Sequence, residues 1–427
     1  DKYASTKALV RGDRSYNTNL QVELLQSQKH QLIFNTTYRF LKVYDKAVSN
    51  QQDDQTLLGR TEYIINEWKG FLTGNVLYEL GTGQEQRRDY AYLEVPAGQG
   101  EYTWIDANND GIQQLNEFEI ARFQDQAKFI RIFTPTNQFT KAAYTTFNYS
   151  VSLNPRAIMG EKGSKGMARF IARFNVQSSL QKSKKSVADK GVEWNPFGYS
   201  ILDTALLTNA TALLNTLSFN RFSSKWGLDI SNIRNTGKAL LTYGYETRQV
   251  IDWTAKLRWN LSSFLTVDVA GKRAQNALYT PNFANRNYEL AIHQVEPRIS
   301  FIQGTVFRLQ SSYKLESKKN LPVYGGEEAL SQAIHLETKY NVLQNSSIDT
   351  KFTYNNIHYK VPTATAKNLS VEYIILDALQ PGANFLWTVD FTKRLLNNVE
   401  VNLQYEGRRP AETRTIHVGR ASVRALF

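Results

Sequence analysis

Long segments of this chain alternate between apolar and polar residues, and this pattern limits the possible folds more than any other feature. Every second residue from Val399 to Tyr405 is apolar, and the residues between them are polar. Successive side chains of a β-strand point to opposite faces, so such a segment predicts a strand with one apolar and one polar face. The same alternation occurs in segments that begin at Trp253, Leu265, Phe307, Ile334 and Phe385.

The length and spacing of these segments favour strands that cross a membrane. The alternating runs last roughly 10 to 16 residues, longer than the strands of most soluble proteins and long enough to span a bilayer at a tilt. Short turn signals such as Ser262-Ser263, Gln303-Gly304 and Asn345-Ser346 recur about every 40 residues, so each interval holds two long strands and one longer loop. Short turns at one rim and long loops at the other are typical of outer-membrane barrels.

We therefore predict an all-β fold, a transmembrane antiparallel outer-membrane β-barrel of about 18 strands, within a range of about 16 to 20. Residues 1–81 and 139–427 are expected to supply barrel strands, and the C-terminal closing strand ends at Phe427. Residues 82–138 are too long for a simple loop and are expected to form a folded loop insertion at the extracellular rim. A soluble, surface-attached β-sandwich also alternates and is the alternative fold.

The composition excludes several kinds of site. The chain has no cysteine, which rules out a disulfide framework, a thiolate metal site and a cysteine nucleophile. No apolar run approaches the ~20 residues of a membrane helix. The net charge is +12, but the basic residues are spread along the strands, so we expect outer-membrane lipid and lipopolysaccharide as partners, and no nucleic acid. The chain starts at Asp1 without an apolar leader, so we expect a mature or truncated product.

One segment matches the pattern of a calcium-binding loop, D-x-[DN]-x-[DN]-G-x5-E. Asp106, Asn108 and Asp110 would supply side-chain oxygens, Ile112 its backbone carbonyl, and Glu117 a bidentate carboxylate. Because the flanking residues are not clearly helical, a free-standing calcium turn is expected rather than a pair of EF-hands. The alternative is an Asx-rich turn that is held by its own hydrogen bonds, without a metal.

Motifs for catalysis are weak. The five histidines are far apart in the sequence, and no G-x-S-x-G nucleophile motif occurs. The glycine-rich segment 160–166 lacks the G-K-[ST] ending of a phosphate-binding loop. We therefore predict no enzymatic activity, no catalytic residues and no organic cofactor.

Three stretches resemble large outer-membrane proteins of Bacteroidota. They are the run from Glu94 to Asp106 with its continuation Asn116–Ile120, the segment Tyr243–Arg248, and the C-terminal pair of segments Tyr405–Arg408 and Thr415–Arg420. The resemblance covers residues 55–427. It implies an outer-membrane location and the C-terminal barrel portion of a longer protein, and it implies little about activity because most members are uncharacterised.

The leading functional prediction is a pore or scaffold subunit of an envelope machine for secretion, outer-membrane protein assembly or surface display. Such a subunit would bind other envelope proteins or lipoproteins. The alternatives are a porin or substrate-selective channel, which predicts an open lumen, and an outer-membrane hydrolase, which needs clustered Ser, His and Asp residues at one rim.

Overall fold

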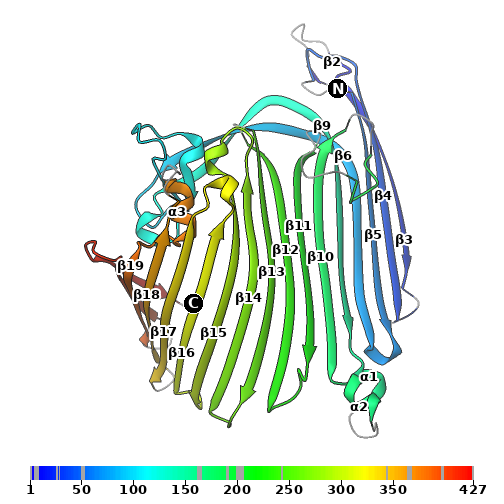
Figure 1. Cartoon of the computed structure of the whole chain (residues 1–427). Coiled ribbons are helices and arrows are strands. Elements are labelled where there is room, and N and C mark those ends of the chain that lie inside the picture. Colours follow the sequence, from blue (N-terminus) through cyan, green and yellow to red (C-terminus); the bar gives the residue numbers. More distant parts are fainter. Residues whose placement is uncertain are drawn as a thin grey trace. The chain divides into compact units, whose positions relative to one another are not determined.

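Figure 1 shows a computed structural model of the chain of 427 residues. The structure describes residues 2–3, 9–25, 27, 29–49, 53–160, 166–188, 192–198, 206–241, 244–342, 345–362, 368–395 and 399–425. The chain forms two compact units. Unit 1 comprises Asp1–Asp89, Thr134–Leu217 and Ile233–Thr247, and unit 2 comprises Tyr90–Phe133, Ser218–Asn232 and Arg248–Phe427.

Unit 1 is built on an antiparallel sheet of long strands. Its first strands follow one another as β3 (Asp13–Leu24), β4 (His30–Val43), β5 (Asp54–Glu67) and β6 (Leu72–Glu94). β6 also pairs with β9 (Phe129–Leu153), which is followed in the sheet by β10 (Phe174–Val187) and β11 (Leu206–Phe219). β12 (Trp226–Leu241) and β13 (Gly244–Asn260) each have residues in both units. A short hairpin of β1 (Lys2–Tyr3) and β2 (Leu9–Val10) precedes the sheet.

Unit 2 contains the most regular part of the sheet. Each strand is hydrogen-bonded to the next in the chain, from β14 onwards always antiparallel. These strands are β14 (Leu265–Tyr279), β15 (Tyr288–Gln303), β16 (Phe307–Asn320), β17 (Glu328–Val342), β18 (Ser346–Lys360), β19 (Gly382–Leu395), β20 (Val399–Arg409) and β21 (Ile416–Ala425). Figure 1 shows β14 to β18 side by side as long arrows from green to orange.

The remaining elements are short. Unit 2 has the strands β7 (Tyr102–Trp104) and β8 (Phe118–Ile120), helix α3 (Leu369–Ile375) and the 3-10 turns η2 (Leu115–Glu117), η3 (Gln124–Gln126), η4 (Ala284–Arg286) and η5 (Pro322–Tyr324). Unit 1 has η1 (Trp68–Gly70), α1 (Arg156–Met159) and α2 (Met167–Ile171).

Among the residues that the structure describes, no helix combines the length and the apolar character needed to cross a membrane.

The long strands of unit 2 have one apolar and one polar face, as their alternation predicts. On β15, Val295 and Ile299 are 50% and 53% exposed, whereas Ser300 on the opposite face is only 5% exposed. The strand register places residues of the same face in rows across the strands. Val295, for example, lies between Gly271 of β14 and Leu315 of β16. We call the side with Val295 and Ile299 the apolar face of unit 2 and the opposite side its polar face.

The apolar face carries many large side chains that are exposed to the surroundings. Its members include Leu257, Trp259, Tyr313, Ile334, Phe352 and Leu403. A soluble sandwich would bury such a face against a second protein layer, but no second layer covers these residues in the described part of the chain. Since an apolar surface this wide marks contact with lipid or protein, and the strands are long enough to cross a bilayer, the apolar face is a lipid-contacting surface.

The predicted all-β fold with long antiparallel strands is therefore confirmed, including the positions of the short turns. β13 and β14 are joined by residues 261–264 and β15 and β16 by 304–306, and Asn345 directly precedes β18. The expected number of about 18 barrel strands stays a prediction, and the predicted terminal residue Phe427 lies outside the described residues.

The structure differs from the expected strands in a few places. β6 continues to Glu94 and β9 begins at Phe129, so both strands run further into the predicted insertion 82–138 than expected. They do so because Tyr90, Tyr92 and Phe133 continue the apolar pattern that the intervening polar residues obscure.

We expect Leu403→Arg to block assembly, whereas Gln404→Arg at the next position should be tolerated. Leu403 is 46% exposed on the apolar face, and an arginine on the lipid side near the midplane costs about 2–4 kcal/mol. Gln404 lies on the polar face, where it donates a hydrogen bond to Glu406. The measurement is the folded fraction of each variant in lipid vesicles, from heat-modifiable migration on gels. Equal folded fractions would show that the two faces are assigned wrongly.

Candidate functional site

Residues 90–133, which we call the cap, form a small folded body within unit 2. β7 pairs with β8, and Tyr102 of β7 also pairs with Phe129 at the start of β9. Three rings form its core: Tyr92 stacks on Phe118 with the ring centres 3.9 Å apart, and Phe118 meets Phe129 edge-on at 5.0 Å. A side chain at Gly100 would come within 2.5 Å of the backbone nitrogen of Phe129, so this close approach requires glycine.

Helix α3 connects the cap to the polar face of the sheet. Its N-terminus is capped by Asn368, whose side chain accepts a hydrogen bond from the backbone N–H of Val371 at 3.2 Å. At its other end Ile375 and Leu376 are each 2% exposed, and they belong to one apolar cluster with residues of four strands: Ala274, Leu290, Ile292, Ala329 and Ile357. These strand residues occupy positions of the polar face, so the alternation is broken where the helix docks.

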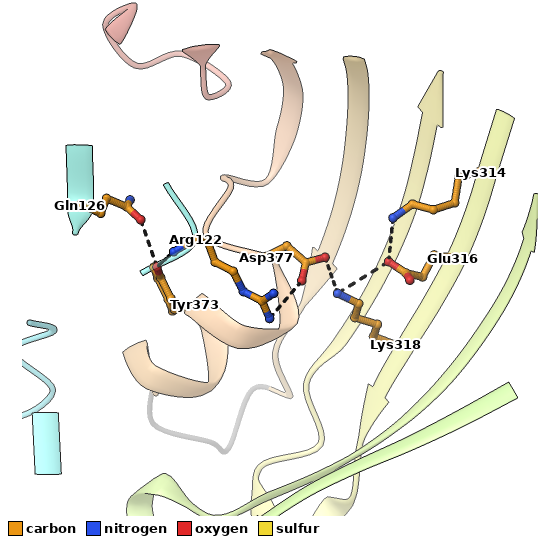
Figure 2. A network of polar contacts seen from close by, with 7 residues as sticks. All are labelled: Arg122, Gln126, Lys314, Glu316, Lys318, Tyr373 and Asp377. Atoms are coloured by element: carbon orange, nitrogen blue, oxygen red, sulfur yellow. Dashed lines mark hydrogen bonds and ion pairs between the residues drawn. The ribbon is translucent and has the colours of Figure 1, made fainter. Parts of the chain in front are cut away.

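A chain of charged side chains links the cap, α3 and β16 (Figure 2). The guanidinium of Arg122 in the cap lies 3.8 Å from one carboxylate oxygen of Asp377, which follows α3. The other oxygen of Asp377 accepts from the ammonium of Lys318 at 2.5 Å. Glu316 lies between Lys318 and Lys314, at 3.6 Å and 3.4 Å respectively. The positive and negative groups thus alternate from the cap to the wall of strands.

Tyr373 of α3 adds two neutral hydrogen bonds to this network (Figure 2). Its hydroxyl oxygen accepts from the backbone N–H of Arg122 at 3.0 Å, and the O–H donates to the side-chain oxygen of Gln126 at 3.0 Å. Burial raises the pKa of Tyr373 above its ordinary value. The phenol therefore stays protonated at physiological pH and keeps its donor role.

Two further ion pairs hold the cap against the rest of unit 2, and both involve buried arginines. Arg286 of η4 donates to Glu119 at 2.6 Å, and the two side chains are 2% and 4% exposed. Arg408 of β20 donates to Asp125 at 2.5 Å and lies over the ring of Phe123, 4.0 Å from its centre. Such pairs define the position of the cap, because removal of one partner would leave a buried charge without compensation.

The predicted calcium ligands lie together at one end of the cap. Asp106 accepts hydrogen bonds from the backbone N–H groups of Asp110 and Gly111 at 3.1 Å and 2.9 Å. Asn108 accepts from the N–H of Asp110 at 3.1 Å, and Asp110 from that of Ile112 at 2.7 Å. These bonds are those of an Asx-rich turn, the alternative to a calcium site. Each of the accepting oxygens still keeps a lone pair that could bind a cation.

The fifth predicted ligand, Glu117, has a different environment. It is 1% exposed, and its carboxylate accepts from the indole N–H of Trp104 at 2.9 Å and from the backbone N–H groups of Ala107 and Gln114. Among the residues with described positions, no group of three His, Asp or Glu side chains is placed to hold a metal ion. A calcium site would therefore also need Asn108 and the carbonyl of Ile112, and it stays a prediction.

Further from the cap, the polar face of unit 2 has a recess of mixed charge with a volume of about 270 Å³. Glu296 and Arg298 of β15 form an ion pair of 2.7 Å at its edge, and His335 of β17 is hydrogen-bonded to Thr353 at 3.0 Å. Charged groups of both signs neutralise one another there, so the recess suits polar solutes without a strong preference for either sign.

The long strands and the turn motif are visible in the sequence, but the contacts of the cap are not. Arg122, Asp377 and Tyr373 carry no motif, because they come together only when three distant segments fold. One signal was present: Leu290 and Ile292 are apolar at positions where the alternation calls for polar residues. Such a break indicates that something covers the polar face.

Comparisons with known proteins add only general similarity. No protein-family model and no curated protein matches the chain. The ferric-catecholate import receptor Fiu of E. coli K12 is 8% identical, with a TM-score of 0.40 over 96% of this chain and 66% of that one. The FrpB iron transporter of Neisseria meningitidis is 11% identical, with a TM-score of 0.39 over 98% of this chain and 75% of that one. OmpT, an outer membrane protein of Vibrio cholerae, is 8% identical, with a TM-score of 0.29 over 84% of this chain and 93% of that one. The chain thus spans just under two thirds of the length of Fiu.

The location follows from the strands themselves. Only helices and barrels of strands satisfy all backbone hydrogen bonds within lipid, and strands of this length with one exposed apolar face are those of outer-membrane proteins. The chain is a β-strand protein of the cell outer membrane.

We expect calcium to protect the turn of the cap against proteolysis if the predicted site binds it. Asp110→Ala should abolish that protection, because it removes one ligand and the acceptor for Ile112. The measurement is the cleavage rate of the parent and the variant with calcium and with a chelator. Glu101→Gln, an exposed change in the same cap, is the control. If calcium has no effect on the parent protein, the calcium prediction is wrong.

We expect Glu119→Gln to loosen the cap, because Arg286 would lose its facing carboxylate. Breaking a buried pair in this way costs about 3–5 kcal/mol, so the cap should open far more often and be cleaved faster by proteases. Glu101→Gln again serves as the control. If both variants are cleaved at the same rate as the parent, the pair does not hold the cap in place.

Proposed function

We propose that this protein is an outer-membrane β-barrel that serves as a pore or scaffold subunit of an envelope machine, in secretion, outer-membrane protein assembly or surface display. The supporting observation is the cap, which buried ion pairs fix to the polar face of unit 2. A passive diffusion pore needs its polar surface free for solutes, whereas here part of the chain itself occupies that surface.

The kind of contact supports a stationary cap. Helix α3 buries Ile375 and Leu376 against the strands, and Arg286 and Arg408 are each buried with a carboxylate partner. Loops that open freely usually have few buried apolar contacts and exposed backbone hydrogen bonds. The cap has the opposite properties, and its outer side would be available to partner proteins.

The proposed partners are outer-membrane lipid, lipopolysaccharide and other envelope proteins or lipoproteins, and nucleic acid is not among them. Calcium is proposed only for the turn of the cap. We also propose kinship with the large outer-membrane proteins of Bacteroidota, on the three stretches of sequence that resemble them.

A substrate-selective channel is the second candidate, and the mixed-charge recess on the polar face favours it. An outer-membrane hydrolase has no such support. In the described part of the chain, His30, His335 and His417 form hydrogen bonds with Tyr63, Glu67, Thr353 and Tyr405, and none of these bonds is to a serine. We therefore propose that the protein is not an enzyme.

The test combines conductance in planar bilayers with purification from native membranes in mild detergent. A capped scaffold should conduct weakly and bring other envelope proteins with it in fixed proportion. Glu119→Gln should raise the conductance by loosening the cap, and the exposed change Glu101→Gln should not. A steady, high conductance of the parent protein, purified without partners, would instead establish the channel and end the scaffold proposal.

A further inference from the structure

The apolar face of unit 2 has a hollow near the ends of the strands that carry the long loops. It has a volume of about 410 Å³, and its lining includes Trp253, Arg273, Gln275, Ala291, His293 and Leu321. Ala291 is small and lies directly opposite Gln275 and Lys319, so the surface is depressed between these longer side chains. The hollow thus lies on the outside of the wall and not on the polar face.

The strand register shows how this hollow is placed relative to lipid. Arg273 of β14 lies directly opposite His293 of β15, which lies opposite Ser317 of β16. The next row on the same face, one step towards the short turns, contains Val295 and Leu315, which are 50% and 39% exposed. A basic row therefore borders directly on the apolar rows, as at the boundary between headgroups and hydrocarbon.

The charges of the hollow leave room for an anion. Arg273 and His293 are both exposed, and neither forms a hydrogen bond or ion pair with any residue whose position the structure describes. The acidic member of the lining, Glu289, accepts a hydrogen bond from the side chain of Gln275. In the adjacent row Lys319 is paired with Glu328 at 2.9 Å. Arg273 is the cation in the lining that lacks a counter-ion.

The remaining lining residues suit a lipid. Trp253 is 48% exposed beside the hollow, and tryptophan is enriched at the level of the lipid headgroups. Leu321 lies at the opposite edge and is 38% exposed. The long loops of outer-membrane barrels face the outside of the cell, so this boundary is that of the outer leaflet.

We propose that this hollow binds the phosphate group of an anionic lipid of the outer leaflet, with Arg273 and His293 as donors and the acyl chains on Val295 and Leu315. Arginine binds phosphate through a planar pair of N–H groups, and the apolar rows below distinguish a lipid from a free anion. The proposal requires that the apolar face contacts lipid and that the long loops face the outside of the cell, and it is independent of the pore or scaffold role.

The experiment measures lipid retention by the full chain in detergent micelles, by native mass spectrometry. The probes are bis-phosphorylated lipid A, its dephosphorylated form, and inorganic phosphate. We expect the parent protein to retain the phosphorylated lipid and neither of the other two. Arg273→Gln should retain about fivefold less, the effect of one basic side chain at an anionic lipid surface.

The control is Arg308→Gln, which removes the same charge from an exposed position on the polar face of β16 and should leave retention unchanged. If Arg273→Gln folds poorly, as judged from heat-modifiable migration, His293→Gln tests the same hollow. The proposal is overturned if Arg273→Gln or His293→Gln retains as much lipid as Arg308→Gln, or if the dephosphorylated lipid is retained equally. Binding of inorganic phosphate alone would overturn the lipid as the ligand.

Discussion

The hydrogen-bond ladder between neighbouring strands is the constraint on which the rest of this structure depends. Backbone N–H and C=O groups in hydrocarbon have no water to bind, so each must find a partner within the protein. The ladder between β14 and β15 meets this demand without interruption, from Leu265 opposite Phe301 to Leu278 opposite Tyr288. Since the ladder fixes the register, it also fixes which side chains face lipid, and a shift by one residue would turn every apolar side chain inwards.

The cap depends on a local exception to this rule. Where α3 docks, the polar face carries Leu290, Ile292 and Ile357, and Lys318 lies opposite Ile292 in the same row. The apolar contact supplies attachment, and the buried pairs with Arg286 and Arg408 define one orientation, because a misplaced cap would leave those charges uncompensated. The cap and the proposed lipid site thus lie on opposite faces of the same strands.

The wall of strands was largely predictable from the sequence, because alternation and short turns are local signals. The alternating segments that begin at Leu265 and Phe307 start at the first residues of β14 and β16, and the turn at Ser262-Ser263 lies where it was expected. Less regular segments were not predictable. Met167–Ile171 form helix α2, which no pattern in the sequence indicated. Helices this short carry too few residues for a periodic pattern.

The contacts of the cap could not be predicted, for a different reason. Glu119 and Arg286, or Asp125 and Arg408, are far apart in the sequence and belong to no motif. The sequence pattern of a charged residue on a polar face is the same whether its side chain contacts water or a buried partner. The calcium pattern, by contrast, is local and was visible, yet a local pattern does not distinguish a metal-binding turn from one held by its own hydrogen bonds.

The anchoring of the cap by Arg408 also sets an order of events during biogenesis. Asp125 of the cap is synthesised 283 residues before Arg408 of β20. The bond between them can form only when β20 has been delivered and has joined its neighbour. A chain that stalls before β20 therefore retains an unfastened cap that quality-control proteases can reach.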